Sequence, residues 1–412
     1  MKNIYKKVRR ILAKISGGII PEEKIPILMP IDNTGSYTAT HISAFSHGNA
    51  GDLLLPVVLR ELFRQTIGVC KWRSKSVRFP VKKFEIDRWN KSDMVVVGGG
   101  GLFLCDSYKN DVSGWQWNCS IERLNEIKAP LIAFAIGYNR FRGQEDFAPI
   151  FAEHVNAFVR KASFVGLRNH GSINALKGYL HSDELKKKLV FQPCMTTLIA
   201  KIYPYFTDYN CKEDFIAFNC AFDRQAMRSK NDDYLKGIAY VAKQLSSKTK
   251  IVYFSHMESD KKVLPYLDSE EVKYEVVEMK DVKQMVTEYS RPRLVIGMRG
   301  HAQMIPFGCQ TPILSVVSHD KMQWFLDDIS HPEWGVDVRD ADFTKKLLDK
   351  ASWLYQNFIE AHEEIKKQQN HLWNITMENM AQIKSSLVGR KCPPQVCRWM
   401  GISNLSILKL AA

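Results

Sequence analysis

Two short stretches in the second half of the chain carry histidine and basic residues at spacings that suit chemistry on an anion. Arg299 and His301 follow the apolar run 294–298. His319 and Lys321 follow the next apolar run. Because parallel strands place their carboxyl ends at one edge of a sheet, two cations and two bases are expected to converge there. A lone buried histidine is more often structural, but one placed two residues from an arginine at a strand-to-helix turn indicates a general acid or base.

Two clusters in the first half match this arrangement. Arg168 follows the apolar run 164–167, where a guanidinium can bind a carboxylate or phosphate through two parallel hydrogen bonds. The alternative for Arg168 is a surface ion pair. The run 94–97 ends in four glycines, among them Gly99 and Gly100, whose backbone amides could approach an anion at a helix start. A close-packed turn is the alternative for the glycines, and their spacing is not that of a dinucleotide-binding fingerprint.

A polar loop at residues 46–52 precedes an apolar helical stretch that begins at residue 53. It contains His47, Asn49 and Asp52, and we interpret it as a loop that binds an acceptor molecule. The alternative is a plain helix start in which Asp52 is the N-cap.

Short apolar or β-branched runs alternate with helix-length segments along most of the 412 residues. Strands are predicted at 25–29, 94–97, 131–136, 164–167 and 189–191, and in a second series at 215–219, 250–254, 272–277, 294–298 and 312–317. This alternation predicts an α/β protein with two doubly wound, Rossmann-like parallel sheets. With a boundary near 200–213, the expected units are an N-terminal domain at 21–205, a C-terminal domain at 206–345, and helices and a tail at 346–412. These last helices are expected to cross back onto the first half.

The net charge of +14 predicts an anionic partner, which could be nucleic acid, an anionic membrane or a small phosphorylated or carboxylated substrate. No nucleic-acid-binding motif in the sequence supports nucleic acid as the partner. Residues 1–20 are predicted to form a basic amphipathic helix, because the apolar residues of 1–15 share one helical face and lysine and arginine occupy the rest. Such a helix suits an anionic inner-membrane surface. The alternative is an ordinary helix packed on the domain.

The basic segment 1–15 does not fit a secretory signal, and no later apolar run reaches membrane-spanning length. A cytoplasmic location is therefore expected, with peripheral attachment to the inner face of the membrane. The odd number of cysteines, nine, favours reduced thiols. Cys392 and Cys397 lie close in sequence but have no second pair or nearby histidine, so no metal site is predicted.

The clusters occur together in an order that resembles the polysaccharide pyruvyl transferase family over roughly residues 40–325. The motifs that carry the resemblance are Gly51-Asp52, the glycine run 98–101, Arg168 with Ser172, Arg299 with His301, and Asp320-Lys321. Three departures from the family pattern, at Asn169, Gln192 and Gly300, bear on the acceptor more than on the donor.

The resemblance implies a fold like that of two-domain GT-B glycosyltransferases, with the donor phosphoenolpyruvate in the cleft between an acceptor-binding first domain and a donor-binding second domain. It implies transfer of pyruvate as a cyclic ketal onto a sugar of a bacterial polysaccharide precursor, with a lipid-linked oligosaccharide as the expected acceptor and no separate cofactor. In this interpretation His301 is the acid and base and His319 its alternate. Arg168, Arg299 and Lys321, helped by the glycine run, bind the donor.

Two other functions compete with this interpretation. A nucleotide-sugar glycosyltransferase could use the same scaffold and phosphate-facing loops, although no acidic motif for a ribose is evident in the second half. A non-catalytic membrane-surface subunit of glycan assembly would explain the basic helix but leave the histidine and arginine clusters without a role. A homo-oligomer is compatible with all three, and the sugar, the hydroxyl pair and the ketal stereochemistry are not specified by these patterns.

Overall fold

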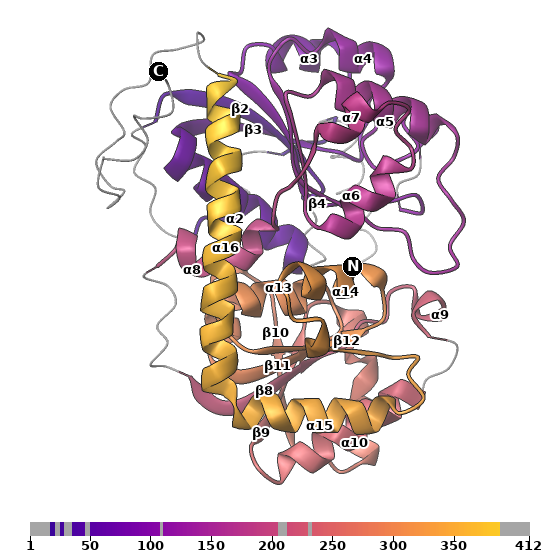
Figure 1. Ribbon diagram of the computed structural model, residues 1–412, viewed down its shortest axis with the longest axis vertical. Coiled ribbons are helices and arrows are strands. Elements are labelled where there is room, and N and C mark those ends of the chain that lie inside the picture. Colours follow the sequence, from indigo (N-terminus) through magenta and orange to yellow (C-terminus); the bar gives the residue numbers. More distant parts are fainter. Residues whose placement is uncertain are drawn as a thin grey trace, which may run out of the picture.

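Two β-sheets, one in each half of the chain, form the frame of the molecule (Figure 1). The computed structural model describes residues 17–20, 25–28, 35–45, 50–107, 110–204, 212–229 and 233–387. The loop residues His47 and Asn49 and the basic segment 1–16 lie outside this range.

The first sheet has the strand order β1-β3-β2-β4-β5-β6-β7, and only the β1–β3 pair is antiparallel. Its strands are β1 (Ile19–Ile20), β2 (Tyr37–Ser43), β3 (Val69–Ser76), β4 (Met94–Phe103), β5 (Leu131–Tyr138), β6 (Phe164–Leu167) and β7 (Leu189–Phe191). The helices between them are α2 (Ala50–Ile67), α3 (Lys83–Trp89), α4 (Ile121–Glu126), α5 (Ile150–Lys161), α6 (His170–Lys177) and α7 (Asp183–Lys187).

The second sheet is parallel throughout, in the order β10-β9-β8-β11-β12-β13. Its strands are β8 (Glu213–Asn219), β9 (Lys250–Ser255), β10 (Tyr274–Glu278), β11 (Pro292–Gly297), β12 (Ile313–Val317) and β13 (Gly335–Asp337). The accompanying helices are α8 (Ile199–Ile202), α9 (Gln225–Arg228), α10 (Asp233–Ser246), α11 (Leu264–Ser269), α12 (Val282–Ser290), α13 (His301–Gly308) and α14 (Asp320–Asp328).

Strand β4 shows why these apolar runs form buried strands. Met94 and Val96 belong to a core that continues into the second half, whereas Val95 and Val97 belong to a second core on the opposite face. Successive side chains of a strand alternate between faces, so a strand covered on both faces reads as a continuous apolar run. The two-sheet α/β fold predicted from these runs is confirmed.

Four strands, β1, β2, β3 and β13, were not predicted, and one prediction was wrong. Residues 25–28, which include Pro26, form no strand. β1 and β13 are short, with two and three residues, and β2 and β3 contain polar residues that an apolar pattern overlooks. These residues are buried with partners: Lys75 pairs with Glu85 at 2.7 Å, and Ser74 accepts a hydrogen bond from Arg60 Nη2 at 2.5 Å.

The glycine run also differs from its prediction, because it lies inside β4 and not at a helix start. Gly98 has a φ of +152°, and a Cβ there would lie 1.9 Å from the carbonyl oxygen of Phe134 on β5. A side chain at this position would separate the two strands, so glycine is needed for the β4–β5 pairing.

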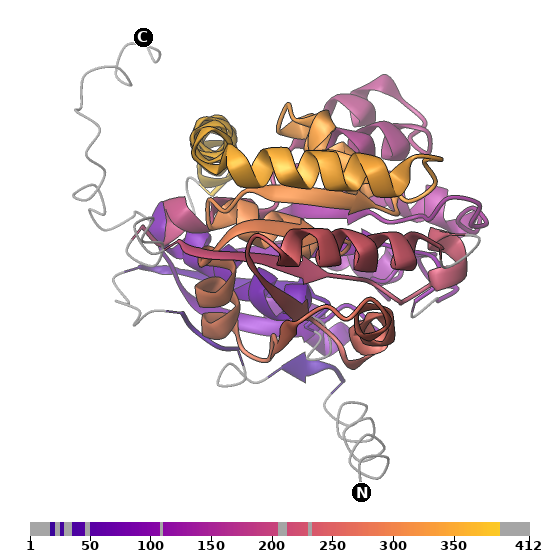
Figure 2. The same cartoon turned by 90° about the horizontal axis from the view of Figure 1, so that it is seen from below.

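The C-terminal helices α15 (Phe343–Gln356) and α16 (Phe358–Ser385) brace the molecule. α15 lies over one face of the second half with α16 beside it, and α16 runs along both halves (Figures 1 and 2). The Gln369 amide donates to the carbonyls of Thr197, Phe307 and Gly308 at 2.9–3.0 Å, and Asn379 donates to Phe191 O at 2.8 Å. The predicted return of these helices to the first half is therefore confirmed.

Candidate active site

Arg168, directly after β6, is a buried arginine whose guanidinium has no hydrogen-bond partner among the described residues. Its side chain lies against the bare backbone of Gly137 on β5, where a Cβ would be 2.3 Å from Nε, and near Gly101 on β4, where a Cβ would be 3.3 Å from Nη2. Its Nε is buried, and within the described chain the guanidinium forms no hydrogen bond or ion pair. Since an unpaired buried charge is costly, this arrangement favours a site that binds an anion.

His301 begins α13 and lies against the backbone of Gly51 in α2, where a Cβ would be 1.9 Å from the imidazole Nδ1. Its Nε2 is buried and has no hydrogen-bond partner. Burial, followed by the positive charges of Arg168 and Lys321, holds the pKa of His301 well below 6.5. The ring is therefore neutral near pH 7 when the site holds no anion.

Lys321 and Asp52 complete the cluster from opposite halves. Lys321, in α14, donates from Nζ to Oδ1 of Asn139 at 2.7 Å, and burial with the charge of Arg168 lowers its pKa well below the usual value. Asp52 lies in the first turn of α2. Burial raises its pKa, and the positive charges of Arg78, Lys321 and Arg168, which lower the pKa, offset this only in part. The structure thus brings Asp52, Arg168 and Lys321 together with His301 between the two sheets.

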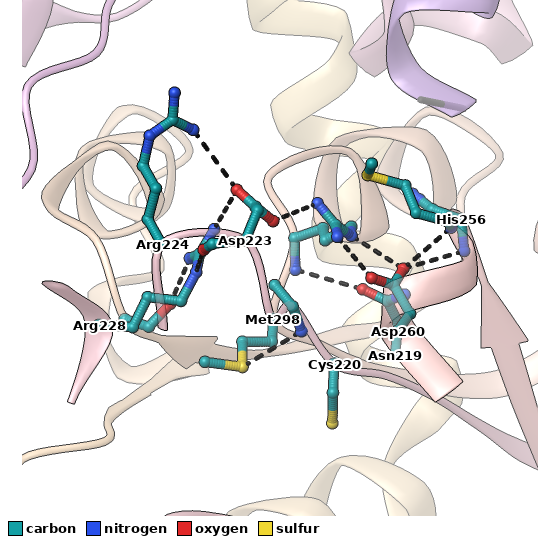
Figure 3. A network of polar contacts seen from close by, with 12 residues as sticks. Asn219, Cys220, Asp223, Arg224, Arg228, His256, Asp260 and Met298 are labelled. Atoms are coloured by element: carbon teal, nitrogen blue, oxygen red, sulfur yellow. Dashed lines mark hydrogen bonds and ion pairs between the residues drawn. The ribbon is translucent and has the colours of Figure 1, made fainter. Parts of the chain in front are cut away.

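Arg299 is fully engaged, unlike Arg168. It donates from Nε to Asp260 Oδ2 at 2.9 Å, from Nη2 to Asp260 Oδ1, and from Nη1 to Asp223 Oδ1 at 2.7 Å (Figure 3). Asp260 is completely buried and also accepts from the backbone N–H of His256 at 3.1 Å. Burial lowers the pKa of Arg299, but the hydrogen bonds and charges of the two carboxylates outweigh this and raise it. The side chain holds the second half's loops in place.

Asp223, after β8, joins these loops to two further arginines. Arg228 Nη2 donates to Asp223 Oδ2 at 3.1 Å, and Arg224 Nη1 lies 3.6 Å from the same oxygen (Figure 3). Burial by itself would raise the pKa of Asp223. The positive charges of Arg228, Arg299 and Lys321 lower it by more than burial raises it, so the pKa lies below its usual value and the carboxylate stays ionised. Sequence reasoning missed this network. The only signal was the position of Asp223 and Asp260 shortly after apolar strands.

His319 is the N-cap of α14, and its Nδ1 accepts from the backbone N–H of Lys321 at 3.4 Å. The ring is fully buried against Phe141, with 4.0 Å between ring centroids, and its Nε2 has no hydrogen-bond partner. Burial and the charge of Lys321 depress its pKa. This position explains how His319 orients the helix that carries Lys321, while a catalytic role stays a prediction.

A Cβ on Gly99 or Gly100 would face α2 and not this cluster. A Cβ on Gly99 would meet Leu59 at 3.3 Å, and one on Gly100 would meet Leu55 at 4.0 Å, so both pack against α2. The neighbouring Gly101 faces Asn139 and Arg168 instead. The structure therefore brings Gly101 to the cluster, and donor binding by Gly99 and Gly100 stays a prediction.

Polar contacts between the halves surround the cluster. Arg224 donates to the carboxylate of Asp106 from Nε at 2.5 Å and from Nη2 at 2.7 Å. His170 Nδ1 lies 2.7 Å from Asp328 Oδ1. Arg142 pairs with Asp320 and with Asp337 of the second half. These contacts hold the two halves against each other around the cluster.

Two general properties of the described residues bear on function. None of their helices is both long and apolar enough to cross a membrane. Their histidine, cysteine and acidic side chains form no group of three or more that could hold a metal ion.

Comparison with known proteins agrees with the fold and identifies the family. The structure is similar to Anabaena HepE, solved with UDP and glucose (TM-score 0.51, 9% identity, covering 85% of this chain and 99% of that one). It is also similar to UDP-GlcNAc 2-epimerase from Neisseria meningitidis (TM-score 0.50, 12% identity, 86% and 100% covered) and from Methanocaldococcus jannaschii (TM-score 0.50, 12% identity, 76% and 92% covered). These likenesses show the fold alone, and it is the GT-B-like architecture expected from the sequence.

At the level of sequence, none of the curated proteins matches the chain. The family model of polysaccharide pyruvyl transferase matches residues 49–320, which is more than half of the chain and includes Asp52, Arg168 and His301. The chain therefore belongs to the polysaccharide pyruvyl transferase family and is a transferase.

Proposed function

We propose that this transferase moves the pyruvyl group of phosphoenolpyruvate onto two hydroxyls of one sugar in a polysaccharide precursor and releases phosphate. The observation that carries the proposal is the buried guanidinium of Arg168 beside Lys321 and His301, to which no described residue is hydrogen-bonded. Phosphoenolpyruvate offers a carboxylate and a phosphate, and a guanidinium and an ammonium suit these two groups.

In the proposed complex, Arg168 binds one anionic group of the donor through paired hydrogen bonds, and Lys321 binds the other. Arg299 acts as a positioning residue, because its Nε, Nη1 and Nη2 already donate to carboxylates. The sequence led us to expect a donor-binding second half that is assisted by Arg168 and the glycine run of the first half. The proposed site keeps Arg168 from the first half and Lys321 from the second, and Arg299 moves from donor binding to positioning.

His301 supplies the proton in this mechanism. It is neutral without ligand, and the negative charge of the donor raises its pKa, so it gains a proton as phosphoenolpyruvate binds. His301 then protonates the methylene carbon, and a sugar hydroxyl attacks the cationic carbon that carries the phosphate. The attacking hydroxyl returns a proton to His301. A second hydroxyl of the sugar then replaces the phosphate, which leaves with that hydroxyl's proton, and the cyclic ketal closes.

The acceptor sugar approaches from the α2 side of the cleft in this proposal. Asp52 faces Lys321 and Arg168 there, and its carboxylate can orient a sugar hydroxyl. His47 and Asn49 belong to the same loop in sequence and are proposed to contact the acceptor too. We further propose a lipid-linked acceptor at the inner face of the membrane, reached through residues 1–20. Deleting residues 1–15 should abolish sedimentation with anionic vesicles, and unchanged sedimentation would exclude this attachment.

A nucleotide-sugar glycosyltransferase is the second candidate, because HepE shares the fold and was solved with UDP and glucose. The two functions differ in the donor that binds at Arg168. The test is a thermal-shift titration of the wild type and Arg168→Met with phosphoenolpyruvate, phosphate, UDP and UDP-glucose. Arg123→Met is the matched control, since Arg123 pairs with Glu126 on the surface of α4.

Phosphoenolpyruvate should raise the melting temperature of the wild type and of the control, and the shift should disappear in Arg168→Met. Stabilisation by UDP or UDP-glucose alone, lost in Arg168→Met, would contradict the proposal and favour the glycosyltransferase. Incubation of the enzyme with phosphoenolpyruvate and an acceptor sugar should then yield pyruvylated sugar and release phosphate, and both products together would establish the reaction itself.

A further inference from the structure

A groove runs along the junction of the two halves, between α6 and α14, which face each other in Figure 1. One part is lined by Tyr138, Phe141, Tyr179 and Trp324, and has a volume of about 510 Å³. The next part is lined by His170, Asn174 and Asp327, among others. Ala175 and Trp324 line both parts, so the two parts of the groove adjoin at these residues.

One end of this groove adjoins the candidate active site. Phe141 lines the groove and packs on His319, with 4.0 Å between ring centroids. Asp320, another lining residue, is the chain neighbour of Lys321. Lys321 in turn is held by Asn139, which precedes the lining residue Arg140. A ligand in the groove would therefore lie beside the cluster that we assign to the donor.

Aromatic rings held in place by their neighbours form the groove's walls. Trp324 is fixed against α6, because a Cβ on Gly171 would lie 2.0 Å from its ring. Tyr138 and Tyr179 are linked through their hydroxyls at 3.1 Å, and Tyr179 also donates to Asp146. Flat apolar rings edged by hydroxyl and carboxylate groups suit a ligand that combines apolar faces with hydroxyl groups.

The charges of the groove differ from those of the donor site. Four carboxylates line it, at Asp146, Asp320, Asp327 and Asp328, against the two arginines Arg140 and Arg142. Arg142 is already bound by two carboxylates, of Asp320 and Asp337. A phosphorylated ligand would meet excess negative charge, so the groove favours a neutral one.

We propose that this groove binds a neutral saccharide, namely the sugars of the acceptor that adjoin the one that receives pyruvate. That the saccharide is an acceptor rests on the proposed function, whereas its chemical class rests on the rings and charges of the groove. The groove thereby makes the enzyme select for an oligosaccharide over a single sugar.

The experiment measures binding of the full-length protein, with inorganic phosphate present, to immobilised mono-, di- and trisaccharides of glucose, galactose, mannose and N-acetylglucosamine. Trp324→Ala removes the ring shared by both parts of the groove, and Ala175→Trp fills the same point without removing any core side chain. Trp353→Ala is the matched control, because Trp353 is 48% exposed on α15.

The wild type and the Trp353→Ala control should bind a di- or trisaccharide more tightly than its monosaccharide. Trp324→Ala and Ala175→Trp should each weaken this binding by about tenfold or more. Equal binding by wild type and both groove variants, or no saccharide binding by the wild type, would overturn the proposal. A thermal shift with phosphoenolpyruvate that persists in Trp324→Ala would show that the donor site is intact. Saccharide binding without any donor shift in the wild type would contradict the proposed function and leave the groove assignment standing.

Discussion

Arg168 and Arg299 were both predicted to bind the donor, yet their surroundings predict opposite effects on stability. In Arg299→Met, the hydrogen bonds from described residues that remain to the fully buried carboxylate of Asp260 come from the backbone N–H groups of His256 and Met257, at 3.1 and 3.2 Å. Removing one partner of a buried ion pair costs about 3–5 kcal/mol. For a folding unit of about 200 residues this lowers the melting temperature by roughly 6–20 °C.

Arg168→Met removes a guanidinium that forms no hydrogen bond or ion pair with a described residue and whose burial outweighs the attraction of Asp52, so the ligand-free protein should be as stable as the wild type or more stable. The assay is thermal unfolding of both variants with and without phosphoenolpyruvate. Adding Asp260→Leu to Arg299→Met should recover much of the lost stability, because both charges are then absent. A loss of stability in Arg168→Met equal to that in Arg299→Met would refute the reasoning, since it would mean that Arg168 has a structural partner.

Three further predictions concern histidines and one glycine. Calorimetric titration with phosphoenolpyruvate near pH 7.5, repeated in buffers of different ionisation enthalpy, should show that the protein takes up a proton on binding. His301→Gln should abolish this uptake. Equal uptake in the variant would exclude His301 as the group that is protonated. Burial lowers the pKa of His154 to about 4 and of His256 to about 3, so below about pH 6.5 the unfolded chain binds protons that the folded protein does not. The free energy of unfolding should therefore fall by up to about 1.4 kcal/mol per pH unit for each of these histidines, and urea titrations at pH 7 and 5 that give equal stability would contradict this. Gly51→Ala should lower turnover without loss of donor binding, because its methyl group would displace the His301 ring, and unchanged kcat would argue against that contact.

Much of the fold was predictable because burial leaves a local pattern. Strands such as β4 and β12, covered on both faces, appear as apolar runs, and the turns after them carry the polar residues that meet at the sheet edge. Arg168, His301 and Lys321 were found in this way, each shortly after such a run. β2 and β3 lack such apolar runs and were missed. Their buried polar side chains, such as Thr40 in β2 and Ser74 and Lys75 in β3, are satisfied by partners elsewhere in the chain.

The sequence by itself determined the α/β class, the family motifs and which residue types stand at the strand ends, because these follow from local spacing. Only the tertiary structure decided which of those residues are free to bind a ligand. Arg168 and Arg299 occupy similar positions after apolar strands, but Asp260, 39 residues away in sequence, satisfies Arg299, and no described residue satisfies Arg168. Likewise, the groove between α6 and α14 joins residues of both halves. Hydrogen bonds and cavities depend on which segments the fold places side by side, and spacing along the chain does not carry that information.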